Sequence, residues 1–120
     1  MLNQLQDVFK SFQFHNIKYV IIGGIAAALH GVPRATFDLD IFIEATEENA
    51  KNLVEAMLDA KLGTVALTTP KDILDNEISI FQDRVRIDVQ TKTPGIIFGK
   101  AWQNRKIIVK KKFTFSQRKI

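Results

Sequence analysis

Two aspartates, Asp38 and Asp40, stand two residues apart in a run of mostly apolar, strand-forming residues from 36 to 43. Residues i and i+2 of a β-strand point to the same face, so this spacing predicts that the two carboxylates project together, while Leu39 and Ile41 project to the opposite face. Two like charges about 4 Å apart repel by about 4 kcal/mol at an effective dielectric of about 20. The pair therefore favours a cation between its members, and a divalent metal is the simplest candidate.

A third carboxylate, Asp88, lies within another β-type run from 85 to 89. Taken alone, it is more typical of a strand-end acid or of an ion-pair partner for Arg86. If strand pairing places it beside Asp38 and Asp40, the three form a carboxylate triad. Aspartate oxygens suit Mg²⁺ or Mn²⁺, and Mg²⁺ needs few protein carboxylates because water or phosphate fills its remaining positions.

Gly23 and Gly24 lie between a predicted strand at 18–22 and a helix-forming run at 25–29. Glycine lets the backbone approach a ligand closely, and the N-terminus of a helix presents free N–H groups to an anion. A lone glycine pair is usually only a turn, but Arg34 and Thr36 follow it, and a guanidinium and a hydroxyl both suit phosphate oxygens. We therefore expect a phosphate site next to the metal site.

Hydrophobic periodicity predicts the elements that position these groups. Helices are expected at 2–13, 46–63 and 97–103, with a short helical turn at 70–76, and strands at 18–22, 36–43, 78–81, 85–89, 107–109 and 113–115. Residues 82–84 are the expected hairpin turn. This order predicts an α/β (α+β) fold, in which helices pack against a mixed β-sheet, as one domain spanning residues 1–120.

The composition fits a globular protein, with 46% hydrophobic and 25% charged residues. There is no cysteine, which excludes disulfides and thiolate metal ligands, and a cytoplasmic location is the default expectation. Neither a signal-peptide pattern nor an apolar run of about 20 residues is present, so no membrane association is expected. The formal net charge is +4 with a basic C-terminal end, for which a solvated strand edge is a more ordinary explanation than nucleic-acid binding.

Taken in order, these motifs resemble the nucleotidyltransferase superfamily that includes the polymerase-β-like enzymes. The chain looks most like its small prokaryotic members of the abortive-infection toxin type. The residues that carry the resemblance are Gly23, Gly24, Arg34, Thr36, Asp38, Asp40 and Asp88. One departure is Gly24, because many members have a phosphate-contacting serine there.

The resemblance implies an enzyme that uses Mg²⁺ or Mn²⁺ to move a nucleoside monophosphate from an NTP to a hydroxyl acceptor, in a toxin–antitoxin or defence context. It implies that the glycine turn, Arg34 and Thr36 hold the phosphates, and that the three aspartates hold the metals. The acceptor is open among a tRNA, a protein hydroxyl and a small molecule. Relatives often continue into further helices, so a homodimer or a partner subunit is expected to complete the acceptor site.

Two alternatives remain open from the residues. One is a catalytically silent NTP-binding or antitoxin-like partner protein of the same fold. The other is a basic RNA-binding module that uses the C-terminal lysines Lys110, Lys111 and Lys112.

Overall fold

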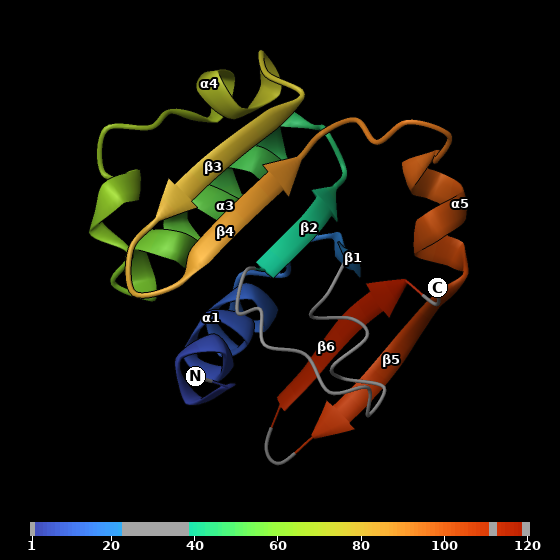
Figure 1. Ribbon diagram of the computed structural model, residues 1–120, viewed down its shortest axis with the longest axis horizontal. Helices are drawn as coiled ribbons and strands as arrows, with labels where there is room; N and C mark the ends of the chain where they lie inside the picture. Colours follow the sequence, from blue (N-terminus) through green and yellow to red (C-terminus); the bar gives the residue numbers. More distant parts are fainter. Residues whose placement is uncertain (1, 23–38, 111–112, 119–120) are drawn as a thin grey trace.

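A four-stranded mixed sheet carries the fold (Figure 1). Its strands are β1 (Tyr19–Ile22), β2 (Leu39–Ile43), β3 (Ile78–Gln82) and β4 (Arg86–Gln90), in the order β1-β2-β4-β3. The central pair β2 and β4 is parallel, and the other two pairs are antiparallel. The structure, a computed structural model, describes residues 2–22, 39–110 and 113–118, with side chains for 5–22 and 39–104.

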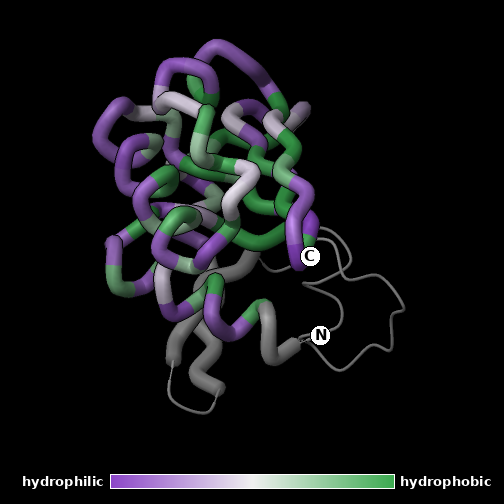
Figure 2. The backbone as a smooth tube through the Cα atoms, turned by 90° about the vertical axis from the view of Figure 1, so that its left-hand side faces the viewer, coloured by the Kyte–Doolittle hydropathy of each residue, from purple (hydrophilic) through white to green (hydrophobic). Residues whose placement is uncertain are grey.

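Two helices, α1 (Leu2–Phe14) and α3 (Glu47–Asp59), pack on one face of this sheet. Each presents an apolar stripe at helical spacing, as the sequence predicted. The main core is the layer between helices and sheet, and it includes Leu5, Phe9, Phe12, Leu53, Met57, Leu39, Ile41, Ile43, Ile87 and Val89. Figure 2 shows hydrophobic segments in the interior and hydrophilic ones toward the outside. Full burial of one such side chain stabilises the fold by about 1.5–3 kcal/mol.

Helix α3 ends at Asp59, four residues before the predicted end at Gly63. The reason is a C-terminal cap without glycine: Lys61 takes a left-handed φ of 63°. The N–H of Leu62 then donates to the carbonyl of Met57 (3.0 Å), and the N–H of Lys61 donates to that of Leu58 (2.9 Å). This is the Schellman arrangement of hydrogen bonds, which satisfies the last helical carbonyls. Gly63 instead opens the short 3₁₀ helix η1 (Gly63–Val65).

The predicted helical turn after Pro70 is present as α4 (Pro70–Leu74). The hydroxyl of Thr69 accepts a hydrogen bond from the N–H of Asp72, and the Asp72 carboxylate accepts one from the N–H of Thr69. This reciprocal capping box satisfies two backbone donors that a helix start leaves free. The hairpin turn between β3 and β4 is displaced by one residue from the prediction, to 83–85, because the buried Val85 belongs to the turn rather than to the strand.

A smaller apolar cluster lies on the other face of the sheet, beneath α5 (Phe98–Gln103). Phe98 meets Phe42 of β2 edge to face, with ring centroids 5.3 Å apart, and stacks on Trp102 at 5.9 Å. Helix α5 therefore covers the part of this face that belongs to β1 and to the end of β2. The β4 and β3 side of the same face carries half-buried and exposed side chains.

The last two strands, β5 (Arg105–Lys110) and β6 (Phe113–Arg118), form a separate two-stranded sheet. In Figure 1 this hairpin lies to one side of the main sheet, with β6 next to β1 and α1. Helices packed against a mixed sheet confirm the predicted α+β class. Among the described residues, no helix combines the length and hydrophobicity that crossing a membrane requires.

Candidate metal and nucleotide site

Asp40 and Asp88 are direct neighbours across the parallel pair β2 and β4. Paired residues on adjacent strands lie about 4.8 Å apart and point to the same face. Their neighbours Leu39, Ile41, Ile87 and Val89 are buried on the opposite face, in the main core. The two carboxylates are therefore on the face that α1 and α3 do not cover. Both remain partly accessible there.

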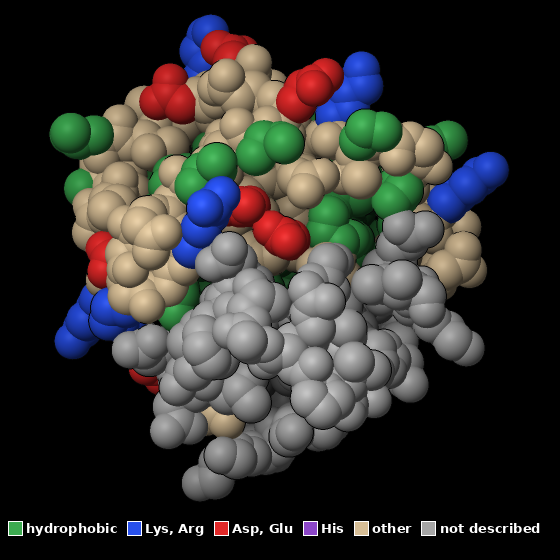
Figure 3. Space-filling view, viewed as in Figure 1, with side chains coloured by type: hydrophobic (Ala, Val, Ile, Leu, Met, Phe, Trp, Pro, Cys, Tyr) green, Lys and Arg blue, Asp and Glu red, His purple; other side chains and the backbone are tan. Residues whose placement is uncertain are grey.

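The register extends this pair into a row across all four strands. Ile22 pairs with Asp40 on one side, and Ile80 pairs with Asp88 on the other. Ile78 and Ile80 are 53% and 55% exposed, so the edge strand β3 forms an apolar border to the acidic centre. Figure 3 shows acidic side chains gathered over β2 and β4, with hydrophobic side chains over β3 beside them.

The carboxylate of Asp88 accepts from Arg86, two residues earlier on the same strand. Arg86 Nε donates to Oδ1 at 2.9 Å, and Nη2 lies 3.4 Å from Oδ2. The ion-pair interpretation of Asp88 that the sequence offered is therefore present in the structure. It does not exclude the metal interpretation, because a guanidinium at this position shows that the paired carboxylates attract positive charge.

The other predicted site residues lie outside the described residues: Gly23, Gly24, Arg34, Thr36 and Asp38. The described chain reaches both ends of that segment. Strand β1 ends at Ile22, the residue before Gly23, and β2 begins at Leu39, the residue after Asp38. Both strand ends lie next to Asp40 in the sheet, Ile22 as its register partner and Leu39 as its neighbour in the chain. The structure thus brings together two of the three predicted carboxylates, Asp40 and Asp88.

The two described carboxylates, those of Asp40 and Asp88, suit a divalent cation. Asp40 and Asp88 offer carboxylate oxygens, which Mg²⁺ and Mn²⁺ prefer, and they come from adjacent strands that hold them in fixed register. Within the described ranges, no cluster of three or more His, Asp or Glu side chains is suited to a metal ion. A complete triad would need Asp38, which those ranges do not include.

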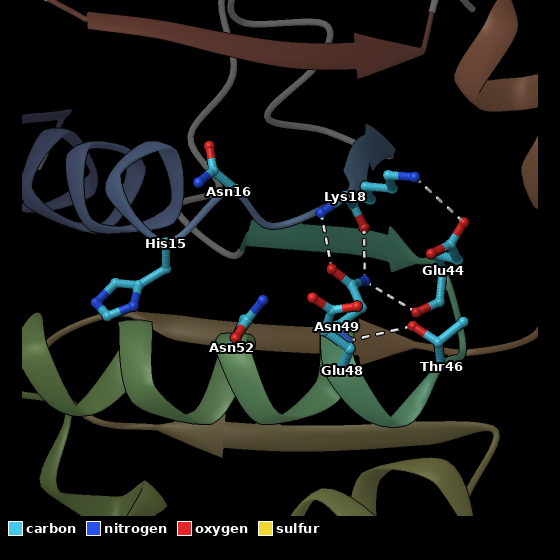
Figure 4. A pocket seen from close by; sticks show the side chains of 8 residues that line it. All are labelled: His15, Asn16, Lys18, Glu44, Thr46, Glu48, Asn49 and Asn52. Atoms are coloured by element: carbon cyan, nitrogen blue, oxygen red, sulfur yellow. Dashed lines mark hydrogen bonds and ion pairs between the residues drawn. The ribbon is translucent and has the colours of Figure 1, made fainter.

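A polar pocket of about 350 Å³ lies at the opposite end of the β1–β2 pair (Figure 4). Its centre is Asn49 of α3, which is only 5% exposed. The Asn49 amide donates to the carbonyls of Lys18 (3.0 Å) and Glu44 (2.9 Å), and its Oδ1 accepts from the N–H of Lys18 (2.9 Å). Asn49 thereby ties α3 to the ends of two strands, and this pocket is explained by structure rather than by a ligand.

Sequence reasoning assigned no role to His15, in the turn after α1. The structure places its Nε2 2.6 Å from Oδ2 of Asp59, at the end of α3. This contact joins the C-terminal ends of the two helices on the core side of the sheet. It joins residues distant in sequence, so no local pattern indicates it. For Arg86 a signal did exist, because positions 86 and 88 share one strand face.

Comparisons of the chain with models of protein families, with curated proteins and with solved structures found no match.

Proposed function

We propose that this domain is a nucleotidyltransferase that uses Mg²⁺ or Mn²⁺ to move a nucleoside monophosphate from an NTP to a hydroxyl acceptor. The observation that carries the proposal is the register pairing of Asp40 with Asp88 on the face of the sheet that α1 and α3 do not cover. These two aspartates are far apart in the chain, and each lies in a strand-forming run of the sequence. Their convergence is what a shared cation site requires.

In this proposal the three aspartates divide the work of binding cations. Asp40 and Asp38 hold the ion on the triphosphate, and Asp88 completes the site beside the acceptor hydroxyl. Bound divalent ions would make the hydroxyl more acidic and offset the charge of the leaving group. The acceptor hydroxyl gives up its proton to solvent, and its oxygen forms a bond to the α-phosphorus. The bond from that phosphorus to the bridging oxygen breaks, and pyrophosphate leaves with the electron pair.

Phosphate binding is assigned to Gly23 and Gly24, with Arg34 and Thr36. The end of β1 supports this assignment, because Ile22 lies next to Asp40 and is followed in the chain by the glycine pair. Strand β1 therefore ends beside one of the two paired carboxylates. Backbone N–H groups at such a point suit phosphate oxygens.

The biological setting rests on the resemblance to small prokaryotic nucleotidyltransferases. It favours a cytoplasmic toxin–antitoxin or defence system, with a tRNA or a protein as acceptor. It also favours a second copy of the chain or a partner subunit that completes the acceptor site.

The test is release of pyrophosphate from each of the four NTPs with Mg²⁺ or Mn²⁺, in the presence of total tRNA or of cell protein. The wild type should release pyrophosphate, and Asp40→Asn and Asp88→Asn should not. Asp75→Asn is the matched control, because Asp75 is exposed at the C-terminal end of α4 and forms an ion pair with Lys71. Full activity in Asp40→Asn and Asp88→Asn would refute the metal role.

The same experiment separates the alternatives. An NTP that binds with Mg²⁺ but releases no pyrophosphate over hours would identify a silent NTP-binding protein. RNA binding that survives Asp40→Asn and Asp88→Asn but is lost when Lys110, Lys111 and Lys112 are neutralised would identify a basic RNA-binding module.

A further inference from the structure

Both carboxylate oxygens of Asp88 face the guanidinium of Arg86. Nε of Arg86 donates to Oδ1 at 2.9 Å, and Nη2 lies 3.4 Å from Oδ2. The two residues occupy alternate positions of β4, so they share the face that also carries Asp40. The carboxylate is mostly shielded, with 18% of its side chain exposed, whereas 39% of the Arg86 side chain is exposed. The guanidinium side of this ion pair is thus the more accessible to solvent.

The charges of this face explain why a cation is needed. Two carboxylates held side by side on neighbouring strands repel each other. Arg86 places a positive charge against Asp88 and so offsets part of this repulsion. A guanidinium presents its donors in a planar fork, which matches the two oxygens of a carboxylate.

A divalent ion at Asp88 has to use an oxygen that faces this guanidinium. We propose that Arg86 is a built-in counter-ion that occupies the cation position at Asp88 and is displaced when the divalent ion binds. Arg86 is then a positioning residue that sets the affinity for the ion, because the ion binds only the fraction of molecules in which the Asp88 carboxylate is released. This inference rests on the proposed function, since it takes Asp88 to be a metal ligand.

Removal of the Arg86 side chain should therefore tighten binding of the divalent ion. Mn²⁺ affinity is measured by electron paramagnetic resonance of the free ion, without nucleotide, for the wild type and for Arg86→Gln. Partly exposed ion pairs contribute modestly, so we expect Arg86→Gln to bind Mn²⁺ about fivefold more tightly. Arg86→Lys keeps the charge but loses the fork, and its affinity should lie between the two.

A loss of general positive charge would also attract Mn²⁺, so a charge-matched control is needed. Lys92→Gln removes one positive charge just beyond the end of β4. Lys92 has 76% of its side chain exposed, and it lies 3.8 Å from Glu77 rather than near Asp88. Its Mn²⁺ affinity should stay within about twofold of the wild type, because exposed charges are screened.

The results separate failure of this inference from failure of the proposed function. If the wild type binds Mn²⁺, Asp88→Asn weakens binding, and Arg86→Gln is no tighter than Lys92→Gln, the counter-ion role is wrong and the metal site stands. Asp88→Asn is also made in the wild-type background and in the Arg86→Gln background. If it weakens Mn²⁺ binding in neither background, both proposals are wrong.

Thermal unfolding supplies a second measurement that does not depend on activity. Without metal, Arg86→Gln should unfold at a lower temperature than the wild type, because the two carboxylates lose their counter-ion. Mn²⁺ should raise its unfolding temperature by more than that of the wild type, since tighter binding to the native state stabilises it more. An equal or smaller rise in an Arg86→Gln variant whose circular dichroism spectrum matches that of the wild type would overturn the proposal.

Discussion

Asp40 and Asp88 lie side by side on the parallel strands β2 and β4, with their side chains on the face that the two core helices leave open. Between them the chain forms α3, η1, α4 and β3 and then returns to the middle of the sheet. A parallel pairing requires such a long crossover, so the contact is a property of the whole fold. Its consequences can be measured.

The first prediction concerns the coupling of these two residues. If they share one ion, either single Asn substitution removes most of the binding, and the second has little left to remove. Asp40→Asn and Asp88→Asn should each weaken Mn²⁺ binding by at least about tenfold. The Mn²⁺ affinity of the double variant should lie within about threefold of that of the weaker-binding single variant. Isothermal titration with Mn²⁺ measures this cycle. Independent, additive losses would contradict a shared site.

The second prediction concerns Asn49. Its side chain is buried and satisfies three backbone groups of Lys18 and Glu44. Asn49→Ala leaves those three groups without their partner and unties α3 from the strand ends, so we expect a loss of about 2–4 kcal/mol in the free energy of unfolding. Asn52→Ala is the control, one turn further along α3 in the same pocket, and should cost less than about 1 kcal/mol. Urea unfolding followed by circular dichroism measures both variants. Equal losses in the free energy of unfolding would show that the hydrogen bonds of Asn49 do not hold α3 to the strand ends.

The third prediction concerns the end of α3. Lys61 has a left-handed φ of 63°. This conformation is unfavourable for a residue that has a Cβ atom, but not for glycine. Lys61→Gly should therefore stabilise the protein by about 0.5–1 kcal/mol, after the greater chain entropy of glycine is subtracted. Asn16→Gly is a useful comparison, because Asn16 has a φ of 56° but asparagine tolerates that region better, and its gain should be smaller. Thermal unfolding measures both, and a destabilised Lys61→Gly would contradict the capping account.

The fourth prediction concerns pH and α4. The pKa of Asp72 lies below its ordinary value of 3.8, first because the backbone N–H of Thr69 donates to its carboxylate and then because of the Thr69 side chain. A lowered pKa in the folded state means that the charged carboxylate stabilises the fold. That contribution is complete above about pH 4 and is lost as the pH falls through the lower folded-state pKa. Below pH 4, the free energy of unfolding should therefore fall less steeply with decreasing pH in Asp72→Asn than in the wild type. Parallel plots of this free energy against pH for the two proteins would contradict the prediction.

The fifth prediction compares the two faces of the sheet with one substitution. Ile41 is fully buried in the main core, and Ile80 is 55% exposed on the open face. Ile41→Ala should cost about 2–4 kcal/mol, and Ile80→Ala less than about 1 kcal/mol. Similar costs in chemical unfolding would mean that a further part of the molecule covers the β3 border.

Much of this fold could be predicted from local pattern. The apolar stripes of α1 and α3 and the alternation in β2 and β4 each state which face is buried, because period 3.6 and period 2 are geometric consequences of helix and strand. The predicted end of α3 at residue 63 is wrong, because Lys61 takes the left-handed conformation that closes the helix. The sequence pattern cannot reveal a cap formed by a residue that seldom adopts a left-handed φ.

The candidate site was predictable in part for the same reason. Period 2 put Asp40 on the face opposite Leu39 and Ile41, and it put Arg86 on the face of Asp88, but the choice between ion pair and metal ligand stayed open. Contacts between distant segments were out of reach, such as that of Asn49 with Lys18, because strand and helix packing alone creates them. Two roles stay predictions: phosphate binding by Gly23, Gly24, Arg34 and Thr36, and metal binding by Asp38.

The most direct test of the central claim is a crystal structure of the protein with Mn²⁺ and a non-hydrolysable NTP analogue, with the ion located by anomalous scattering. We predict an anomalous peak within coordination distance of the Asp40 and Asp88 carboxylates, with the triphosphate against the same site. Full occupancy of the analogue elsewhere, or manganese that avoids both carboxylates, would contradict the nucleotidyltransferase proposal.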